Sequence, residues 1–169
     1  MSTEASMKTF LSSPFIAVVG ASSNTQKFGH KIFAWYLHHN IAAIPINPSA
    51  PTITVPSLNN KEVPTVPSLS ALPNPKETSV SIITPPAVTL KVLEEAKNLG
   101  VPAVWLQPGT FDDEVLQYAR QGEGELADSE VDGKGFKAVV AGFGGGTRAH
   151  DGWCVLVDAE RGLKAIGKL

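Results

Sequence analysis

Apolar runs rich in β-branched residues alternate with amphipathic stretches over the first 121 residues of the chain. Four runs are typical of strands buried in a parallel sheet: 16–20, 42–46, 79–84 and 104–106. Three stretches place their apolar residues on one helical face: 29–40, 86–99 and 111–121. Strand–helix alternation with short connections predicts an α/β fold that is doubly wound. Its mainly parallel five-stranded sheet would carry helices on both faces.

Residue types at the expected helix ends support these boundaries. Asn40 suits the left-handed residue that ends the first helix. Pro86 suits the first turn of the second helix, and Gly100 suits its left-handed stop. Thr110 is the expected N-cap of the third helix, whose first turn carries three acidic residues.

The segment 49–75 is punctuated by six prolines, which long regular elements do not tolerate at this spacing. We expect a loop there, with a short edge strand at 63–66 and one helical turn at 68–72.

From Gly122 onward the chain holds eleven of its fifteen glycines and no proline. We expect two strand segments, at 137–141 and 153–157, joined by a flexible link at 142–152. The glycines at 144–146 have no clear helix behind them, which favours a flexible loop over a phosphate loop. Asp158, Glu160 and Arg161 are expected in a surface turn.

Composition limits the domain count, the partners and the compartment. With 169 residues, of which 43% are hydrophobic, the chain is expected to form one domain over 1–169, with a short N-terminal extension at 1–13. The formal net charge of −2 argues against a nucleic-acid partner, because proteins that bind nucleic acid typically present a basic surface. No apolar run approaches the ~20 residues of a membrane span. Cys154 is the only cysteine, so no internal disulfide can form, and we expect a cytoplasmic protein.

The first expected strand ends in Gly20, Ala21, Ser22 and Ser23, shortly before a helix. A small-residue turn at a helix N-terminus exposes backbone N–H groups to which an anion can bind. In open α/β sheets the ligand lies beyond the carboxyl ends of the strands, where the strand order reverses. Three segments should converge there: 20–23, 47–48 and 84–86. This predicts a ligand that bears phosphate.

The obvious ligand, a nicotinamide dinucleotide, fits these motifs poorly. The fingerprint G-x-G-x-x-G is missing, because the glycine after Gly20 is Gly29. The second strand ends in Asn47 and Pro48, where an acidic residue would bind the ribose. No G-x-x-x-x-G-K-[ST] occurs, which excludes a P-loop.

Three motifs, VVGAS at 18–22, IPINP at 44–48 and VWLQPG at 104–109, resemble the single-domain CoA-binding family. That family is similar to the CoA-binding domain of the succinyl-CoA synthetase α subunit. The resemblance covers 15–121 continuously and implies a Rossmann-like fold that holds CoA. Family members usually join the two apolar segments that correspond to 137–141 and 153–157 directly. The glycine-rich part at 122–152 would therefore contain an insertion, from 142 to 153.

The resemblance also implies a place for each part of the ligand. The turn at 20–23 would hold the pyrophosphate, and Asn47 with Pro48 would border the adenosine. Residues Thr84, Pro85 and Pro86 would lie along the pantetheine side. Members often carry lysine directly after the Asn-Pro pair, where this chain has Ser49. Lys27 or Lys31 would then supply the positive charge.

Other residues have plainer interpretations beside these. The run 84–86 also suits a simple helix start. Cys154 is expected to be a buried free thiol and Trp105 a core residue. The three histidines at 30, 38 and 39 have no metal-site spacing and are expected to be exposed or near helix ends. Gln107 either faces the ligand or makes a loop hydrogen bond.

Three functions remain open from the sequence. The first is a module that binds CoA or acyl-CoA without catalysis of its own, because no nucleophile–base pair is recognisable. The second is an NAD(P)-dependent oxidoreductase with a degenerate fingerprint, although no Tyr-x-x-x-Lys occurs. The third is an interaction protein that has lost its ligand site, a reading motivated by Ser49, in which 51–75 would be a docking surface for an unidentified protein partner.

Overall fold

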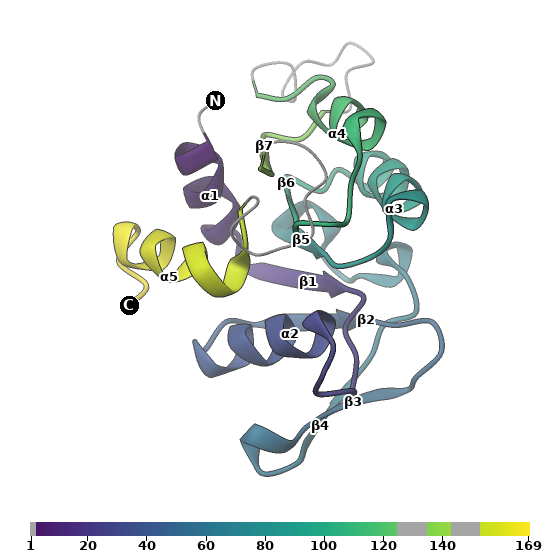
Figure 1. Cartoon of the computed structure of the whole chain (residues 1–169), viewed down its shortest axis with the longest axis vertical. Helices are drawn as coiled ribbons and strands as arrows, with labels where there is room; N and C mark the ends of the chain where they lie inside the picture. Colours follow the sequence, from purple (N-terminus) through teal and green to yellow (C-terminus); the bar gives the residue numbers. More distant parts are fainter. Residues whose placement is uncertain (1–2, 125–134, 143–152) are drawn as a thin grey trace.

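The computed structural model describes residues 3–124, 135–142 and 153–169. Its centre is a parallel sheet in the order β2-β1-β5-β6-β7 (Figure 1). The strands are β1 (Phe15–Val19), β2 (Ala43–Ile46), β5 (Thr78–Ile82), β6 (Ala103–Leu106) and β7 (Ala138–Val140). Val18 of β1 pairs with Pro45 on one side and Ser81 on the other. The predicted five-stranded parallel α/β fold is confirmed.

Successive residues of a strand point to opposite sides of the sheet, so these apolar strands present an apolar surface on each face. Helices cover both of these faces. Ile16 and Val18 pack into one core with α1 (Thr3–Leu11), α2 (Phe28–His38) and α5 (Val155–Ala165). Ala17 and Val19 pack into a second core with α3 (Pro86–Leu99) and α4 (Asp113–Arg120). Trp105 is fully buried in the first core, as expected.

The expected helix ends are largely confirmed. Asn40 has φ 57°, and Gly100 has φ 76° with its N–H bonded to the carbonyls of the last turn of α3. The N-cap expected at Thr110 is wrong. The side chain of Asp112 accepts the N–H of Val115 at 2.9 Å and caps α4, while the Thr110 hydroxyl donates to the carbonyl of Gln107 at 2.7 Å.

The proline-rich segment contains an antiparallel hairpin of β3 (Thr52–Val55) and β4 (Lys61–Pro64). The expected edge strand therefore lies two residues earlier, and β3 was not predicted. Ile53 and Val55 are fully buried in the first core, so the hairpin is fixed to the domain beside α2 (Figure 1). The expected helical turn at 68–72 is confirmed as the 3-10 turn η2 (Leu69–Ala71). Two further 3-10 turns complete the region, η1 (Pro56–Leu58) and η3 (Pro75–Glu77).

The C-terminal segment departs most from expectation. The strand at 137–141 is confirmed as β7, but the strand expected at 153–157 is wrong, because α5 begins at Val155. The Asp158 carboxylate accepts the N–H of Cys154 at 2.9 Å at the start of this helix. Asp158, Glu160 and Arg161 therefore lie on α5 and not in a surface turn. The flexible link and the glycines at 144–146 fall almost entirely outside the described residues.

Residues 3–11 form α1, where the sequence suggested only an extension. Met7, Phe10 and Leu11 are buried, and the helix packs against β6, β7 and α5. Phe10 meets Trp105 edge to face, with ring centroids 5.5 Å apart.

Candidate functional site

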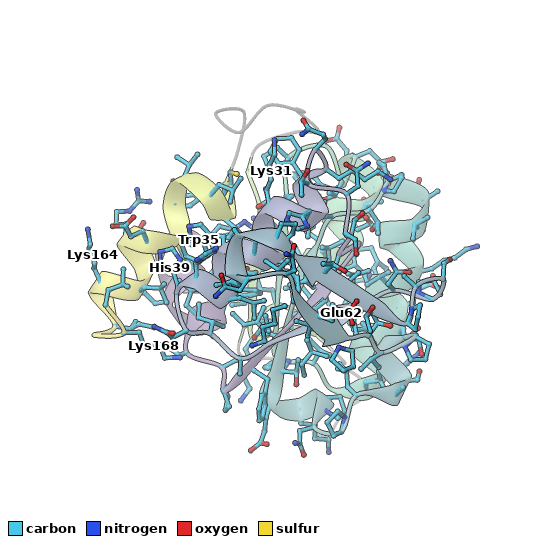
Figure 2. The ribbon with its side chains drawn as sticks, turned by 90° about the horizontal axis from the view of Figure 1, so that it is seen from below. Lys31, Trp35, His39, Glu62, Lys164 and Lys168 are labelled. Carbon is cyan, nitrogen blue, oxygen red and sulfur yellow. The ribbon has the colours of Figure 1, made fainter. Side chains whose placement is uncertain are left out.

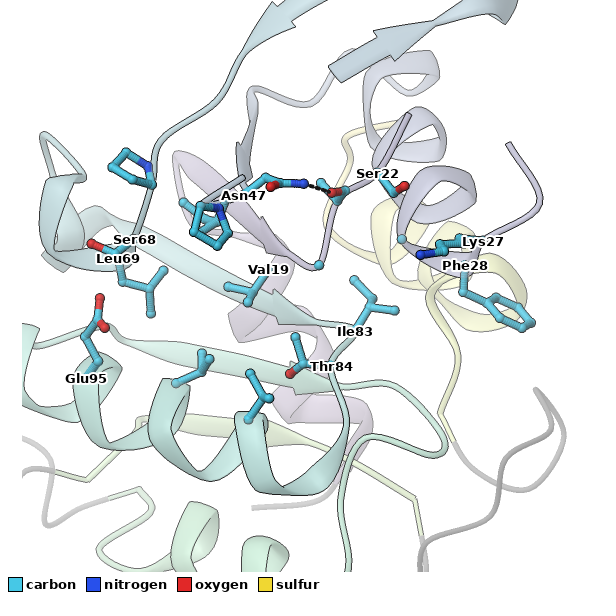
Figure 3. A pocket seen from close by; sticks show the side chains of 18 residues that line it. Val19, Ser22, Lys27, Phe28, Asn47, Ser68, Leu69, Ile83, Thr84 and Glu95 are labelled. Carbon is cyan, nitrogen blue, oxygen red and sulfur yellow. Dashed lines mark hydrogen bonds between the residues drawn. The ribbon is translucent and has the colours of Figure 1, made fainter. Parts of the chain in front are cut away.

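A cleft of about 610 Å³ opens at the carboxyl ends of β1, β2 and β5 (Figure 3). The chain passes from β1 outward to β2 and then returns to β5 on the other side of β1, so the strand order reverses here. Such a switch point is where α/β sheets of this order bind ligands. Its volume lies within the range of small-molecule sites.

Two glycines allow α2 to begin directly beside the end of β1. Gly20 has φ 96°, and a Cβ there would lie 2.5 Å from the carbonyl oxygen of Ile83. A Cβ on Gly29 would lie 1.9 Å from the carbonyl oxygen of Gly20. Gly29 therefore permits the close helix–strand packing for which dinucleotide fingerprints use their third glycine. In the sequence, Gly29 stood out only as the start of the expected helix and as a mismatch to that fingerprint.

The β1–α2 turn is held through its carbonyl groups. Asn47 Nδ2 donates to the carbonyl of Ala21 at 3.1 Å, and His30 Nδ1 lies 2.8 Å from the carbonyl of Ser22. Among the described residues, no acceptor pairs with the backbone N–H groups of Ala21, Ser22 or Ser23. The first turn of α2 adds its own unpaired N–H groups. The turn therefore presents donors next to the cleft, as an anion requires.

Asn47 positions the turn through both ends of its side-chain amide. Its Oδ1 accepts the N–H groups of Ser49 at 2.8 Å and Ala50 at 3.0 Å, while its Nδ2 bonds to Ala21. The Asn47 side chain thus stabilises the turn that follows β2 and links the end of β2 to the β1–α2 turn. Pro48 lines the cleft at this corner.

Charge is sparse in the cleft. Among the described residues that line it, only Lys27 and Glu95 are formally charged. Lys31 does not line it, and its ammonium lies 5.4 Å from the ring centroid of Phe28. Phe28 is 47% exposed and Val88 45% exposed, so the rim carries apolar side chains open to solvent.

Seven of the ten residues predicted from the sequence line the cleft: Gly20, Ala21, Ser22, Lys27, Asn47, Pro48 and Thr84. Ser23, Pro85 and Pro86 do not. The Ser23 hydroxyl instead accepts the N–H of Thr54 at 3.0 Å, which ties the turn to β3. Pro85 and Pro86 begin α3, the plainer interpretation of that motif. Contact of any of these residues with a ligand stays a prediction.

The sequence analysis missed the walls formed by α3 and by the segment after β4. The missed residues are Val19, Phe28, Gly29, Ile46, Pro67, Ser68, Leu69, Ile83, Val88, Val92 and Glu95. Val88, Val92 and Glu95 are spaced by four and three residues, so they share one side of α3. That spacing was visible in the sequence, but a helix stripe of this kind is normally core.

The other polar candidates serve the fold. Cys154 is buried, as expected, and accepts a hydrogen bond from Gln107 Nε2 at 3.2 Å. Gln107 Oε1 accepts the N–H of Val155 at 2.8 Å, so Gln107 holds the start of α5 and does not line the cleft. Burial raises the pKa of Tyr36, whose hydroxyl donates to Ser81 at 3.2 Å.

The histidines form no metal site within the described residues. His30 lies in the first turn of α2 and is buried. His38 ends α2, and His39 stacks on Trp35 with ring centroids 3.8 Å apart (Figure 2). None of the described helices has both the length and the hydropathy of a membrane-spanning segment.

Comparison with known proteins identifies the family. The family model described as "CoA binding domain" matches residues 15–133. The chain belongs to this CoA-binding domain family. The resemblance inferred from the sequence is thereby confirmed.

Solved structures agree with the fold of this CoA-binding domain protein. A conserved hypothetical protein from Pyrococcus furiosus is 31% identical, over 61% of this chain and 82% of that one, with a TM-score of 0.54. A hypothetical protein from Pyrococcus horikoshii is 22% identical, over 82% and 84%, with a TM-score of 0.62. A Thermus thermophilus protein is 23% identical, over 70% and 84%, with a TM-score of 0.56. No curated protein matches the chain.

Proposed function

We propose that this protein binds CoA or acyl-CoA in the cleft and has no catalytic activity of its own. The observation that carries the proposal is the β1–α2 turn. Its unpaired N–H groups at Ala21, Ser22 and Ser23 lie at the switch point of a CoA-binding domain. A pyrophosphate bound there would also meet the N-terminus of α2, whose dipole favours negative charge.

Lys27 is the cation best placed to meet the phosphates. It is the N-cap residue of α2, and it is the positively charged residue among the described lining residues. We propose that Gly20 and Asn47 shape the site, whereas Ala21, Ser22 and Lys27 contact the pyrophosphate. Pro48 would border the adenosine, and Thr84 would lie along the pantetheine, with Ser23, Pro85 and Pro86 supporting the walls behind them.

The composition of the cleft supports binding without chemistry. The described lining residues include no histidine or cysteine, and Lys27 and Glu95 lie at opposite ends of the cleft (Figure 3). A nucleophile would need an adjacent base to act at neutral pH. Incubation with acetyl-CoA, followed by measurement of free thiol, should show no release above the uncatalysed rate. We also propose a cytoplasmic location, which the single unpaired cysteine supports.

Calorimetric titration of the ligand-free protein with CoA tests the binding. We expect one saturable site per chain, and stronger binding of CoA than of NAD or NADP. The Lys27→Ala variant should bind about fivefold more weakly, because an exposed ion pair contributes about 1 kcal/mol. Lys91→Ala is the matched control, since Lys91 is exposed on α3 and lies outside the cleft lining. No saturation up to millimolar CoA, or tighter binding of NADP, would overturn the proposal.

A further inference from the structure

The cleft is polarised along its length. Figure 3 shows Lys27 at the end formed by α2 and Glu95 at the other end, opposite Ser68 and Leu69. Between them runs the stripe of Val88 and Val92 on α3. Val88 and Glu95 are seven residues apart, which is roughly 10 Å along a helix axis. Phosphate is favoured at the Lys27 end and disfavoured at the Glu95 end, since like charges repel.

Glu95 uses only one of its carboxylate oxygens within the protein. Oε1 accepts both the N–H of Ser70 at 2.8 Å and the hydroxyl of Ser70 at 3.2 Å. Oε2 has no hydrogen-bond or ion-pair partner among the described residues. The Ser68 hydroxyl likewise has no partner in the described part of the chain. This end of the cleft therefore offers an acceptor and a hydroxyl between apolar walls.

Those apolar walls belong to Leu69, Val92 and Pro67. A flat ring with a polar edge suits such a slot, because its faces can pack on apolar groups while its edge forms hydrogen bonds. Of the parts of CoA, only the base is flat and aromatic. Its 6-amino group is a donor, which matches an ionised carboxylate oxygen that can only accept.

We propose that the Glu95 end of the cleft recognises the adenine base, whose 6-amino group donates to Glu95 Oε2 while Ser68 contacts the ring edge. This rests on the proposed binding of CoA and adds a preference for a 6-amino purine. The pyrophosphate then lies at the Lys27 end, and the pantetheine leaves over the exposed rim of Phe28 and Val88. A purine with a 6-carbonyl oxygen would set two acceptors against each other in this pose, and its N1–H could reach Glu95 Oε2 only if the ring shifted away from Ser68 and the apolar walls.

The test compares CoA with its hypoxanthine analogue, in which the 6-amino group is replaced by oxygen. We expect the wild-type protein to bind CoA at least tenfold more tightly than the analogue. In Glu95→Gln, the amide oxygen can still accept from Ser70, while the amide NH₂ faces the cleft as a donor. This variant should reverse the preference and bind the analogue more tightly. Glu94→Gln is the control, because Glu94 is exposed and does not line the cleft.

Each outcome of this comparison separates the two proposals. Equal affinity of the wild-type protein for both ligands overturns adenine recognition by Glu95 and leaves CoA binding intact. The same holds if Glu95→Gln weakens both ligands equally while its thermal unfolding matches that of Glu94→Gln. Absence of any CoA binding by the wild-type protein overturns both proposals. The wild-type comparison needs no variant, so it can overturn the proposal even if Glu95→Gln fails to fold.

Discussion

Replacing Gly29 by alanine tests how the β1–α2 turn is built. The new Cβ would lie 1.9 Å from the carbonyl oxygen of Gly20, whereas real Cβ contacts stay beyond 3.0 Å. The two segments must therefore separate by about 1 Å. Overpacking costs about 1–3 kcal/mol, and the upper value applies here because a backbone carbonyl cannot rotate away as a side chain can. Alanine regains about 1 kcal/mol as a better helix residue.

The net expectation is a loss of about 2 kcal/mol in the free energy of unfolding, measured by urea denaturation followed by circular dichroism. CoA affinity should fall more than tenfold, because the unpaired N–H groups move away from the ligand. Gly162→Ala is the control. Its Cβ would lie 2.5 Å from Leu11 Cδ1, the end of a side chain and not a backbone carbonyl, so we expect a smaller loss of stability than for Gly29→Ala. Because Gly162 does not line the cleft, CoA affinity should be unchanged. If Gly29→Ala is as stable as the wild type and binds CoA equally well, the close approach is refuted.

Two further predictions concern the fold. Asp112→Ala removes the N-cap of α4 and should lower the free energy of unfolding by about 1 kcal/mol. Asp113→Ala, at the exposed neighbouring residue, is the control and should lower it clearly less. Equal losses in urea denaturation would contradict the capping role. Tyr36→Phe removes the hydrogen bond to Ser81 and should cost about 1 kcal/mol at pH 7. Burial raises the pKa of Tyr36 above its ordinary value of 10.0, so the stabilising contribution of the neutral hydroxyl is complete below pH 10.0 and is lost progressively as the pH rises further. The stability difference between wild type and Tyr36→Phe should therefore shrink in urea denaturation above pH 10.0, and a constant difference would contradict the burial argument.

Local signals in the sequence were sufficient for the parallel sheet and for most helix ends. Fully apolar runs such as the one around Val18 are buried on both faces whichever neighbours they find, so their period and length already indicate inner strands. Asn40 and Gly100 tolerate the left-handed conformation with little strain, which makes them local stop signals. The turn at Gly20 was predictable from the sequence because glycine adopts a positive φ without strain.

Tertiary packing decided the elements whose local pattern fits more than one structure. The apolar run at 153–157 suits a strand or a helix equally, and helix was selected because Val155, Ala159 and Leu163 together face the sheet and α1. Residues 3–11 form α1 for a similar reason, because Met7, Phe10 and Leu11 pack into the same core as α5. In β3, Ile53 and Val55 alternate as in any half-buried strand, but prolines on both sides hid the pattern. At α4, the helix begins at Asp113, so Asp112 and not Thr110 stands at the N-cap position.

From sequence alone, the chain determined a parallel α/β sheet with a small-residue turn at the end of its first strand, because backbone conformation and strand burial follow from local residue types. The far end of the cleft was decided only by the folded structure. Glu95 and Ser68 are 27 residues apart, and neither belongs to a motif. They face one another because α3 packs directly against η2 in the segment after β4. A groove between two elements exists only once both are in place.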